Sequence, residues 1–275
     1  MNETPLFSHE LLNEYVKVLI NSPWPGRRGS SKRCVYFTLC FFAFIHGGFE
    51  IHASARDISN RTGLSLRTVS GALSSLIQDG KISRIRTSNT NNRPSMLADV
   101  FEMTNFMTYT REEGSRNGGL DSECLLMGNW VEFEQYEYLT WQMHDVFRWK
   151  GLGKSCLEVY YDLSMHPGSK LVDVSNRTGR ALSTIYRCKH RMMDEIVNLT
   201  NYQAISMISV EDNRYSIVEQ DFDGIAVILG VDGDHTKWKK RYEHQREGFR
   251  RRVLRINQEL GIETDTGYIR EFSTY

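Results

Sequence analysis

The sequence has few of the features that identify secreted or membrane proteins. Its 275 residues include five prolines and five cysteines, and no two cysteines form a CxxC pair. An odd number of cysteines without such spacing predicts reduced thiols buried in the helices of a cytoplasmic protein. The longest apolar run, Val35 to Ile45, has 11 residues and is too short to cross a bilayer. No signal peptide is visible at the N-terminus, so we expect a cytoplasmic location and no membrane partner.

Motifs for catalysis and for metal binding are missing as well. The sequence contains neither a Gly-x-Ser-x-Gly nor a His-Glu-x-x-His pattern. Residues 151–155, Gly-Leu-Gly-Lys-Ser, resemble the end of a phosphate-binding loop, but Arg148 stands where the full motif requires glycine. That departure favours a linker that starts a helix. Asp232, Asp234 and His235 precede a predicted helix, where capping is favoured over metal binding. We therefore predict a protein that is not an enzyme, with no cofactor and no metal ion.

The formal net charge of +0 conceals a strong segregation of charge along the chain. Residues 27–93 contain 11 Lys or Arg against three acidic residues, whereas residues 99–147 contain two against ten. Residues 237–255 contain nine against two. A polyanion would be attracted to the two basic segments and repelled by the acidic one. The pattern therefore indicates basic modules that meet nucleic acid, joined by an acidic linker.

A short repeat organises the rest of the sequence. Ser59-Asn60-Arg61-Thr62-Gly63 recurs unchanged 116 positions later, as residues 175–179. In each copy an aliphatic residue, Ile58 or Val174, comes just before the repeat, and a glycine suited to the left-handed position after a helix closes it. A turn and a second helix are expected to follow. The layout predicts a helix-turn-helix in each half of the chain.

In the first copy, Ser65 is expected to cap the second helix. Apolar residues at helical spacing predict the buried face of that helix: Val69, Leu73, Leu76 and Ile77. The residue types that contact base edges and phosphates lie elsewhere on it, and we expect the DNA contacts at Ser65, Arg67, Thr68, Ser70 and Ser74. Residues 82–86 and 96–103 predict a basic hairpin, whose expected DNA contacts are Arg84, Arg86 and Arg93. A helix-turn-helix with such a hairpin is a winged helix-turn-helix.

The second copy departs from the first, because Arg180, Ala181 and Lys189 replace Leu64, Ser65 and Leu73. These changes predict a shifted register in which the buried residues are Leu182, Ile185, Met192 and Met193. The expected outward residues are Ser183, Thr184, Arg187, His190 and Arg191. This helix is more cationic than its counterpart, so we expect it to hold phosphates more than it reads bases. Residues 196–218, with a turn at Asp212-Asn213, predict a second wing.

Residues 236–260 predict a long C-terminal helix with a basic face. We expect Lys239 and Lys240 to contact DNA phosphates. The apolar stripe of this helix leaves two alternatives, a homodimer seam or packing on the second module.

Three segments carry a resemblance to a known group of proteins. They are residues 24–31 (Trp-Pro-Gly-Arg-Arg-Gly-Ser-Ser), the helix-turn-helix of residues 54–80, and residues 225–233 followed by 241–247. They resemble winged helix-turn-helix proteins of bacterial plasmids, phages and integrated elements. The resemblance implies DNA binding in the regulation or replication of a mobile element.

The predicted fold is mainly α-helical with small β-hairpin wings. We expect a winged helix-turn-helix domain at 1–108, an acidic and aromatic linker at 109–150, a second such domain at 151–222 and a basic helical extension at 223–275. The expected function is sequence-specific binding of double-stranded DNA as a transcriptional regulator. One alternative is a replication initiator or origin-binding protein, with replication or transcription proteins as partners. The other is an adaptor that uses its winged domains to bind proteins.

Overall fold

Most of the described chain is helical. The computed structural model describes residues 7–20, 22–86, 99–104, 106, 137–193, 197–198, 203–204, 206–218 and 221–259. Within these ranges it contains ten α-helices, one 3₁₀ helix and short antiparallel strand pairs. The prediction of a mainly α-helical fold with small β-hairpins is therefore confirmed.

In the first half, helices gather around one apolar helix. The amphipathic helix α1 (His9–Ile20) packs on α2 (Gly29–His46), and the Tyr15 and Tyr36 hydroxyls lie 2.9 Å apart between them. The middle of α2 is apolar on nearly all sides, and Val35, Leu39 and Cys40 have no exposed surface. Such a helix must be covered all round. The cover is provided by α1, α3 (Ala55–Thr62), α4 (Leu66–Gln78) and a small sheet.

That sheet has three antiparallel strands in the order β1-β3-β2. They are β1 (Glu50–Ala53), β2 (Ser83–Arg86) and β3 (Asp99–Glu102). Phe101 is the central pairing residue, opposite Ile51 on one side and Arg84 on the other. Both strands of the expected hairpin are thus present, joined by β1 as a third strand, while the residues between the two hairpin strands lie outside the described residues.

A short helical segment joins the two halves. Helix α7 (Glu137–Met143) and the 3₁₀ helix η1 (Asp145–Phe147) come from the acidic, aromatic segment. The ring of Tyr138 lies 5.4 Å from that of Phe37 in α2 and 5.2 Å from that of Tyr161 in α8 (Lys154–Met165). Helix α7 therefore packs between the core helices of both halves, and buried side chains of the two halves form one continuous core.

The second half repeats the order of the first. After α8 come α9 (Leu171–Thr178) and α10 (Leu182–Met193), then β4 (Val197–Asn198), β5 (Gln203–Ala204), β6 (Ile208–Glu211) and β7 (Arg214–Ile217). Ser169 pairs with Tyr215 of β7, and β7 pairs with β6. This three-strand order matches β1-β3-β2. The tight turn of the second hairpin lies at Asp212 and Asn213, as predicted, both with positive φ.

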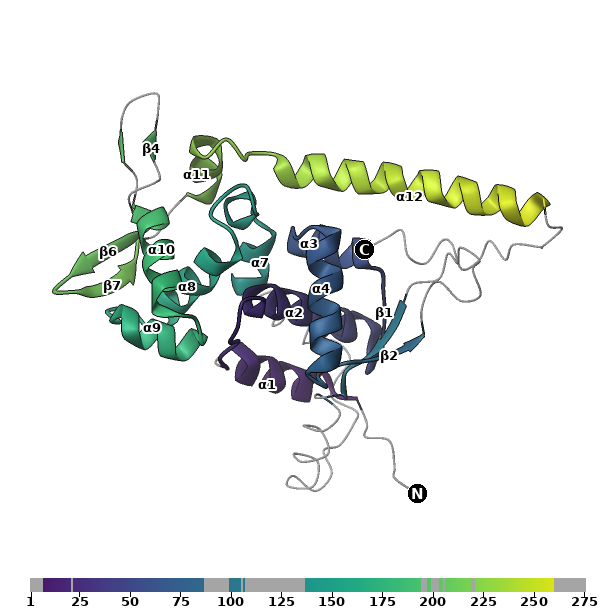
Figure 1. The fold of residues 1–275 in the computed structure, drawn as a ribbon, viewed down its shortest axis with the longest axis horizontal. Helices are drawn as coiled ribbons and strands as arrows, with labels where there is room; N and C mark the ends of the chain where they lie inside the picture. The colour runs from purple at the N-terminus through teal and green to yellow at the C-terminus, as the bar shows by residue number, and fades with distance from the viewer. Residues whose placement is uncertain are drawn as a thin grey trace, which may run out of the picture.

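The chain continues through α11 (Phe222–Ile228) into α12 (Asp234–Glu259). With 26 residues, α12 is about 39 Å long. Figure 1 shows that it passes α3 and extends beyond the other helices at one end of the molecule. No helix in the described ranges combines the length and apolarity that a membrane span requires.

Candidate nucleic-acid interface

The two copies of the repeat build the same kind of turn. Gly63 and Gly179 follow α3 and α9 with φ of 66° and 67°, a conformation that glycine adopts without strain. The Ser59 hydroxyl donates to the Leu64 carbonyl at 2.5 Å, and the Ser175 hydroxyl donates to the Arg180 carbonyl at 2.6 Å. These bonds close the turn from the side of the first helix. The identical residues thus give each pair of helices the same connection.

Helix α4 begins at the residue that the sequence indicated. The Ser65 side chain accepts from the Thr68 backbone N–H at 3.2 Å, which confirms the cap. The predicted buried face is confirmed for Val69, Leu73 and Leu76, while Ile77 is half-buried. The side chains expected at DNA turn the other way, since the exposed residues of this set are Ser65, Arg67, Ser70 and Ser74.

Thr68 is half-buried and takes part in the cap itself. Its hydroxyl lies 2.8 Å from the Ser65 hydroxyl, in addition to the backbone contact. Arg67 and Ser70, the exposed neighbours of Thr68, are therefore better placed to reach a ligand. The outward surface of α4 therefore consists of the Arg67 cation and the serine hydroxyl groups around it.

A second cation reaches this surface from a distant part of the chain. Arg28, in the connector before α2, donates from Nη1 to the Gly71 carbonyl of α4 at 3.3 Å and is exposed. Gly71 leaves room for it, because a Cβ there would lie only 3.2 Å from that nitrogen. The contact joins residues 43 positions apart, so no local spacing could have revealed it. Arg28 is the residue that the sequence analysis missed.

Of the three hairpin arginines predicted to contact DNA, only Arg84 has its side chain within the described residues. The Arg84 guanidinium lies 5.3 Å from the centre of the Phe101 ring and 3.9 Å from Asp99, so it is partly engaged by β3. Arg86 belongs to β2, but its side chain is outside the described residues, as is the whole of Arg93. The role predicted for these two arginines stays a prediction.

Helix α10 does not shift its register. Its buried residues Ile185, Cys188 and Met192 stand 116 positions after Val69, Ala72 and Leu76. The prediction that Leu182 is buried is wrong, since its exposed fraction is 36%, and Met193 is only half-buried. The register is kept because the charged residue that stands in place of Leu64 forms an ion pair with a buried carboxylate.

That residue is Arg180, which replaces Leu64. It forms a double ion pair with the fully buried Glu158 of α8, with Nε–Oε2 and Nη2–Oε1 distances of 2.7 and 3.0 Å. Its Nη1 donates to the Gly26 carbonyl of the N-terminal connector at 2.8 Å. A buried charge is tolerated where such bonds satisfy it. The substitution therefore ties the second turn to the first half instead of moving the helix.

The outward residues of α10 are confirmed in part. Ser183, Arg187 and His190 are exposed, and Thr184 is half-buried. Arg191 was expected to face outward, which is wrong. Its guanidinium donates to the Leu152 and Gly151 carbonyls at 2.7 and 2.6 Å and holds the loop before α8. Five hydrogens on a planar guanidinium match two adjacent carbonyls well, and this explains its inward position.

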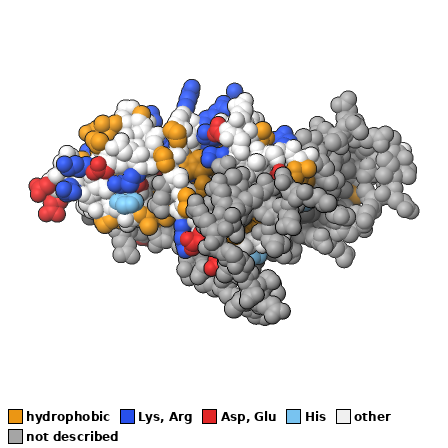
Figure 2. All heavy atoms as spheres, turned by 90° about the horizontal axis from the view of Figure 1, so that it is seen from below, with side chains coloured by type: hydrophobic (Ala, Val, Ile, Leu, Met, Phe, Trp, Pro, Cys, Tyr) orange, Lys and Arg blue, Asp and Glu red, His pale blue; other side chains and the backbone are white. Residues whose placement is uncertain are grey.

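Part of the positive charge of residues 27–93 is used inside the fold. Lys32 forms an ion pair with Asp79 at 2.6 Å, Arg61 lies 3.2 Å over the Phe41 ring, and Lys81 lies 5.1 Å from the Trp24 ring. Burial lowers the pKa of Lys81. Arg27, Arg28 and Arg67 remain exposed. Figure 2 shows Lys and Arg side chains along the upper edge of the molecule in the view from below. The segment therefore contributes fewer exposed cations to the surface than its Lys and Arg count indicates.

The start of α12 is fixed against the first helix-turn-helix. The Tyr242 hydroxyl lies 2.7 Å from the Ser59 hydroxyl, and the His235 backbone N–H donates to Asp145 at 2.6 Å. Because Ser59 already donates its proton to Leu64, Tyr242 is the donor in this pair. The alternative of packing on the second module is wrong for these first turns, because they pack on α3 of the first module. Lys239 and Lys240 are exposed, as expected.

The residues that were considered for phosphate or metal binding have structural roles. Gly153 caps α8 with φ of 81°, and Lys154 is buried and donates to the Gln142 carbonyl, so the lysine faces inward. Burial lowers the pKa of Lys154 to about 8. Asp234 is buried 3.6 Å from Lys150. Within the described ranges, no three His, Cys, Asp or Glu residues are grouped as a metal site would require.

No family model, curated protein or solved structure matches this chain. The resemblance to winged helix-turn-helix proteins of mobile elements therefore stays a prediction. The function proposed below depends on the geometry of the described residues.

Proposed function

We propose that this protein binds double-stranded DNA in a sequence-specific manner and regulates transcription, in the setting of a plasmid, phage or integrated element. The observation that carries the proposal is the outward surface of α4. There Arg67, Ser70 and Ser74 are exposed beside Arg28, at the helix that follows a tight, capped turn. A helix held in this way is the part of a helix-turn-helix that enters the major groove.

Arg67 is the residue proposed to read a base. It lies in the first turn of α4, two positions after the cap, and N-terminal residues of a recognition helix are those that contact base edges. An arginine can donate two parallel bonds to O6 and N7 of guanine. Ser65, Ser70 and Ser74 would donate to nearby bases or phosphates. Arg28 would hold a phosphate at the edge of the groove.

The second helix pair is proposed to hold the DNA backbone. Helix α10 presents Ser183, Arg187 and His190, and among the described residues it has no side-chain cap that matches Ser65. Exposed Leu182 and Tyr186 take up part of the same surface. Phosphate contacts of this kind position a protein without carrying sequence information. Lys239 and Lys240 of α12 would add to them if the duplex continues along that side.

Hydrogen bonds join the two helix pairs, which constrains the target. The Ser30 hydroxyl donates to Glu158 at 2.7 Å, and the Trp24 backbone N–H donates to the Thr178 carbonyl at 3.2 Å. Together with the Arg180 contact to Gly26, these bonds lock the connector of the first half onto the second turn. Two fused modules act as a covalent pair, so the second contact benefits from a high effective concentration.

Selection from a pool of random duplexes, followed by affinity measurements, tests this proposal. For the selected site we expect Arg67→Ala to cost about 1–3 kcal/mol and to relax specificity at one base pair. Arg187→Ala should weaken selected and random duplexes alike and reduce the salt dependence by roughly one ion. Lys17→Ala, in an ion pair with Glu14 on α1, is the control and should change neither.

The same assay separates the alternatives. A protein-binding adaptor would show no steep fall of duplex affinity with salt, and this outcome would refute DNA binding. Binding to its own promoter would support a regulator, whereas binding to direct repeats beside a melted region would indicate an initiator. Inserting five base pairs between the two contacted segments should sharply weaken binding, because half a helical turn moves one segment to the opposite face of the duplex.

A further inference from the structure

A pocket of about 220 Å³ lies where the two halves meet. The first half contributes Ile20, at the end of α1, and Arg33 of α2. The second half contributes Tyr161 and Met165 of α8 and the Arg177–Asp162 pair. Pockets between packed units are common binding sites for small molecules, and this one combines apolar walls with a few charged groups.

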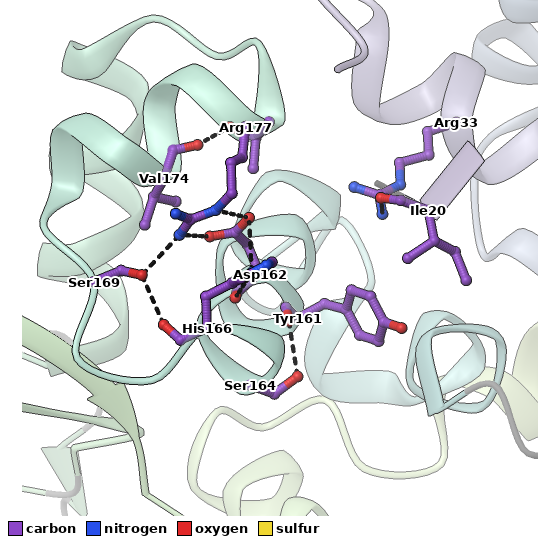
Figure 3. Close-up of polar contacts among 10 residues, drawn as sticks. Ile20, Arg33, Tyr161, Asp162, Ser164, His166, Ser169, Val174 and Arg177 are labelled. Carbon is purple, nitrogen blue, oxygen red and sulfur yellow. Dashed lines mark hydrogen bonds and ion pairs between the residues drawn. The ribbon is translucent and has the colours of Figure 1, made fainter. Parts of the chain in front are cut away.

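One positive charge of the pocket is already neutralised. The Arg177 guanidinium and the Asp162 carboxylate form two parallel hydrogen bonds, with Nε–Oδ1 and Nη2–Oδ2 distances of 3.0 and 2.7 Å. Ser169 accepts a further bond from Arg177 at 2.8 Å. Figure 3 shows this pair on one wall, with His166 close to Asp162. A ligand would meet the pair as a nearly neutral surface.

Arg33 is the charge that has no such partner. Its exposed fraction is 3%, and Nη2 donates to the Ile20 carbonyl at 3.0 Å. Among the described residues, Nε has no hydrogen-bond partner and no carboxylate forms an ion pair with this guanidinium. The Tyr138 ring, 4.6 Å away, covers one face. In Figure 3 the guanidinium points toward the wall that carries Arg177 and Asp162, across the open space.

A buried guanidinium without a paired anion is costly, because burial removes its water. Among the described residues, the Tyr138 and Phe37 rings compensate its charge only in part. An oxyanion in the pocket would supply the counter-charge. The walls formed by Ile20, Tyr161 and Met165 would cover an apolar body next to that group. The arrangement fits a ligand with one negative end and a small apolar remainder.

We propose that this pocket binds a small organic anion, a carboxylate or a phosphate monoester, with its oxyanion at Arg33 and its apolar part against Tyr161 and Met165. The site draws residues from both halves, so the ligand would bridge them. It lies apart from the outward face of α4, and the proposal does not depend on DNA binding.

Titration calorimetry with four probes at constant ionic strength tests the site. Benzoate and phenyl phosphate present the two anions on one ring, benzyl alcohol is neutral, and benzylamine is cationic. We expect at least one of the two anions to bind with one-to-one stoichiometry and at least tenfold more tightly than the alcohol. The amine should not bind measurably. A preference between benzoate and phenyl phosphate identifies the carboxylate or the phosphate as the natural group.

Three variants locate the binding. Arg33→Met should lower the affinity of the anion at least tenfold. Met165→Trp should block the pocket at its rim, where the methionine is 53% exposed, without disturbing the core. Val227→Trp, at an even more exposed position on α11 (64%), is the control and should bind like the parent.

Several outcomes would overturn the proposal: no binding of either anion, equal affinity for benzyl alcohol, or unchanged binding in both Arg33→Met and Met165→Trp. If Arg33→Met does not fold, Met165→Trp against its control decides the question. Because the assay contains no DNA, a negative result leaves the proposed function standing. A failure to bind DNA would likewise leave the pocket proposal intact.

Discussion

Helix pairs α3–α4 and α9–α10 have the same turn and the same buried face but differ in the contacts of their other side chains. The same Ser-Asn-Arg-Thr-Gly residues place a left-handed glycine and a serine-to-carbonyl bond in both turns. The residue after the glycine is half-buried Leu64 in one pair and buried, ion-paired Arg180 in the other. The comparison shows that the five shared residues build the same turn in both pairs, while the residues that follow it make different contacts.

The two helix pairs contact different parts of the chain. In the first pair the turn contacts α12 through Tyr242, and the outward face of α4 is kept for hydroxyl groups, Arg67 and Arg28. In the second pair the turn contacts the N-terminal connector through Arg180, and Arg191 holds the loop before α8. One pair thus leaves its polar groups exposed on the outward face of α4, whereas the other uses Arg180 to contact the first half and Arg191 to hold the loop before α8.

The largest expected effect comes from the buried ion pair. Arg180→Ala should destabilise the protein by about 3–5 kcal/mol, because Glu158 is left charged and fully buried without its partner. Urea unfolding followed by circular dichroism measures the loss. Arg187→Ala, exposed on the next helix, is the matched control and should be neutral within about 0.5 kcal/mol.

A double variant separates two contributions to the free energy of unfolding: the cost of an unpaired buried charge and the loss of the other hydrogen bonds of Arg180 and Glu158. Replacing Arg180 and Glu158 together by leucine should cost much less than Arg180→Ala, since no charge is stranded. An equal loss in the double variant would mean that the bonds to Gly26 and Ser30 carry the stability instead.

The core helices α2 and α8 differ at a second pair of equivalent positions, Thr38 and Lys154, which both contact Gln142. Burial lowers the pKa of Lys154 from its ordinary 10.5 to about 8, so between these values the unfolded chain binds more protons than the folded one. Stability therefore rises with pH in this window, by on the order of 2 kcal/mol from this residue.

Buried thiols such as Cys34, whose pKa burial raises, titrate nearby with the opposite sign. The measurement is therefore the difference in unfolding free energy between the parent and Lys154→Met at pH 8 and pH 10.5. That difference should move in favour of the parent as pH rises, whereas Thr38→Val should show no such trend. A flat difference would contradict a neutralised lysine.

A smaller effect concerns the serines that close the two turns. Ser59→Ala should cost about 1 kcal/mol more than Ser175→Ala, since Ser59 also accepts from Tyr242. The extra cost should disappear when both are measured in a Tyr242→Phe background. If the two serines remain unequal there, their difference arises from burial and not from the contact with α12.

The smallest expected effect concerns the caps. Ser65→Ala should destabilise by about 1 kcal/mol, because the Thr68 N–H loses its acceptor. Ala181→Ser, at the equivalent position of the second pair, should stabilise by roughly 0.5–1 kcal/mol by adding the cap that α10 lacks. Thermal unfolding of both variants checks the pair. A neutral Ala181→Ser would show that the second turn does not present a serine to α10.

Much of the local structure could be predicted from the residues alone. The Ser65 cap, the left-handed glycines and the Asp212-Asn213 turn follow from periodicity and turn chemistry, which act within a few positions. The register of α10 could not be predicted, because it depends on Glu158, 22 residues before its partner Arg180. The inward position of Arg191 has the same cause, carbonyls some 40 positions away.

By itself the sequence determined where helices begin and end, and which residues repeat. Only the tertiary structure decided which charges face water: Arg28 reaches α4 across 43 positions, while Arg33, Arg61 and Lys81 turn into aromatic or buried surroundings. The physical reason is the distance along the chain over which each kind of interaction acts. Caps and turns are satisfied by near neighbours in the chain, whereas a cation is satisfied by whichever carbonyl, ring or carboxylate the packing brings to it.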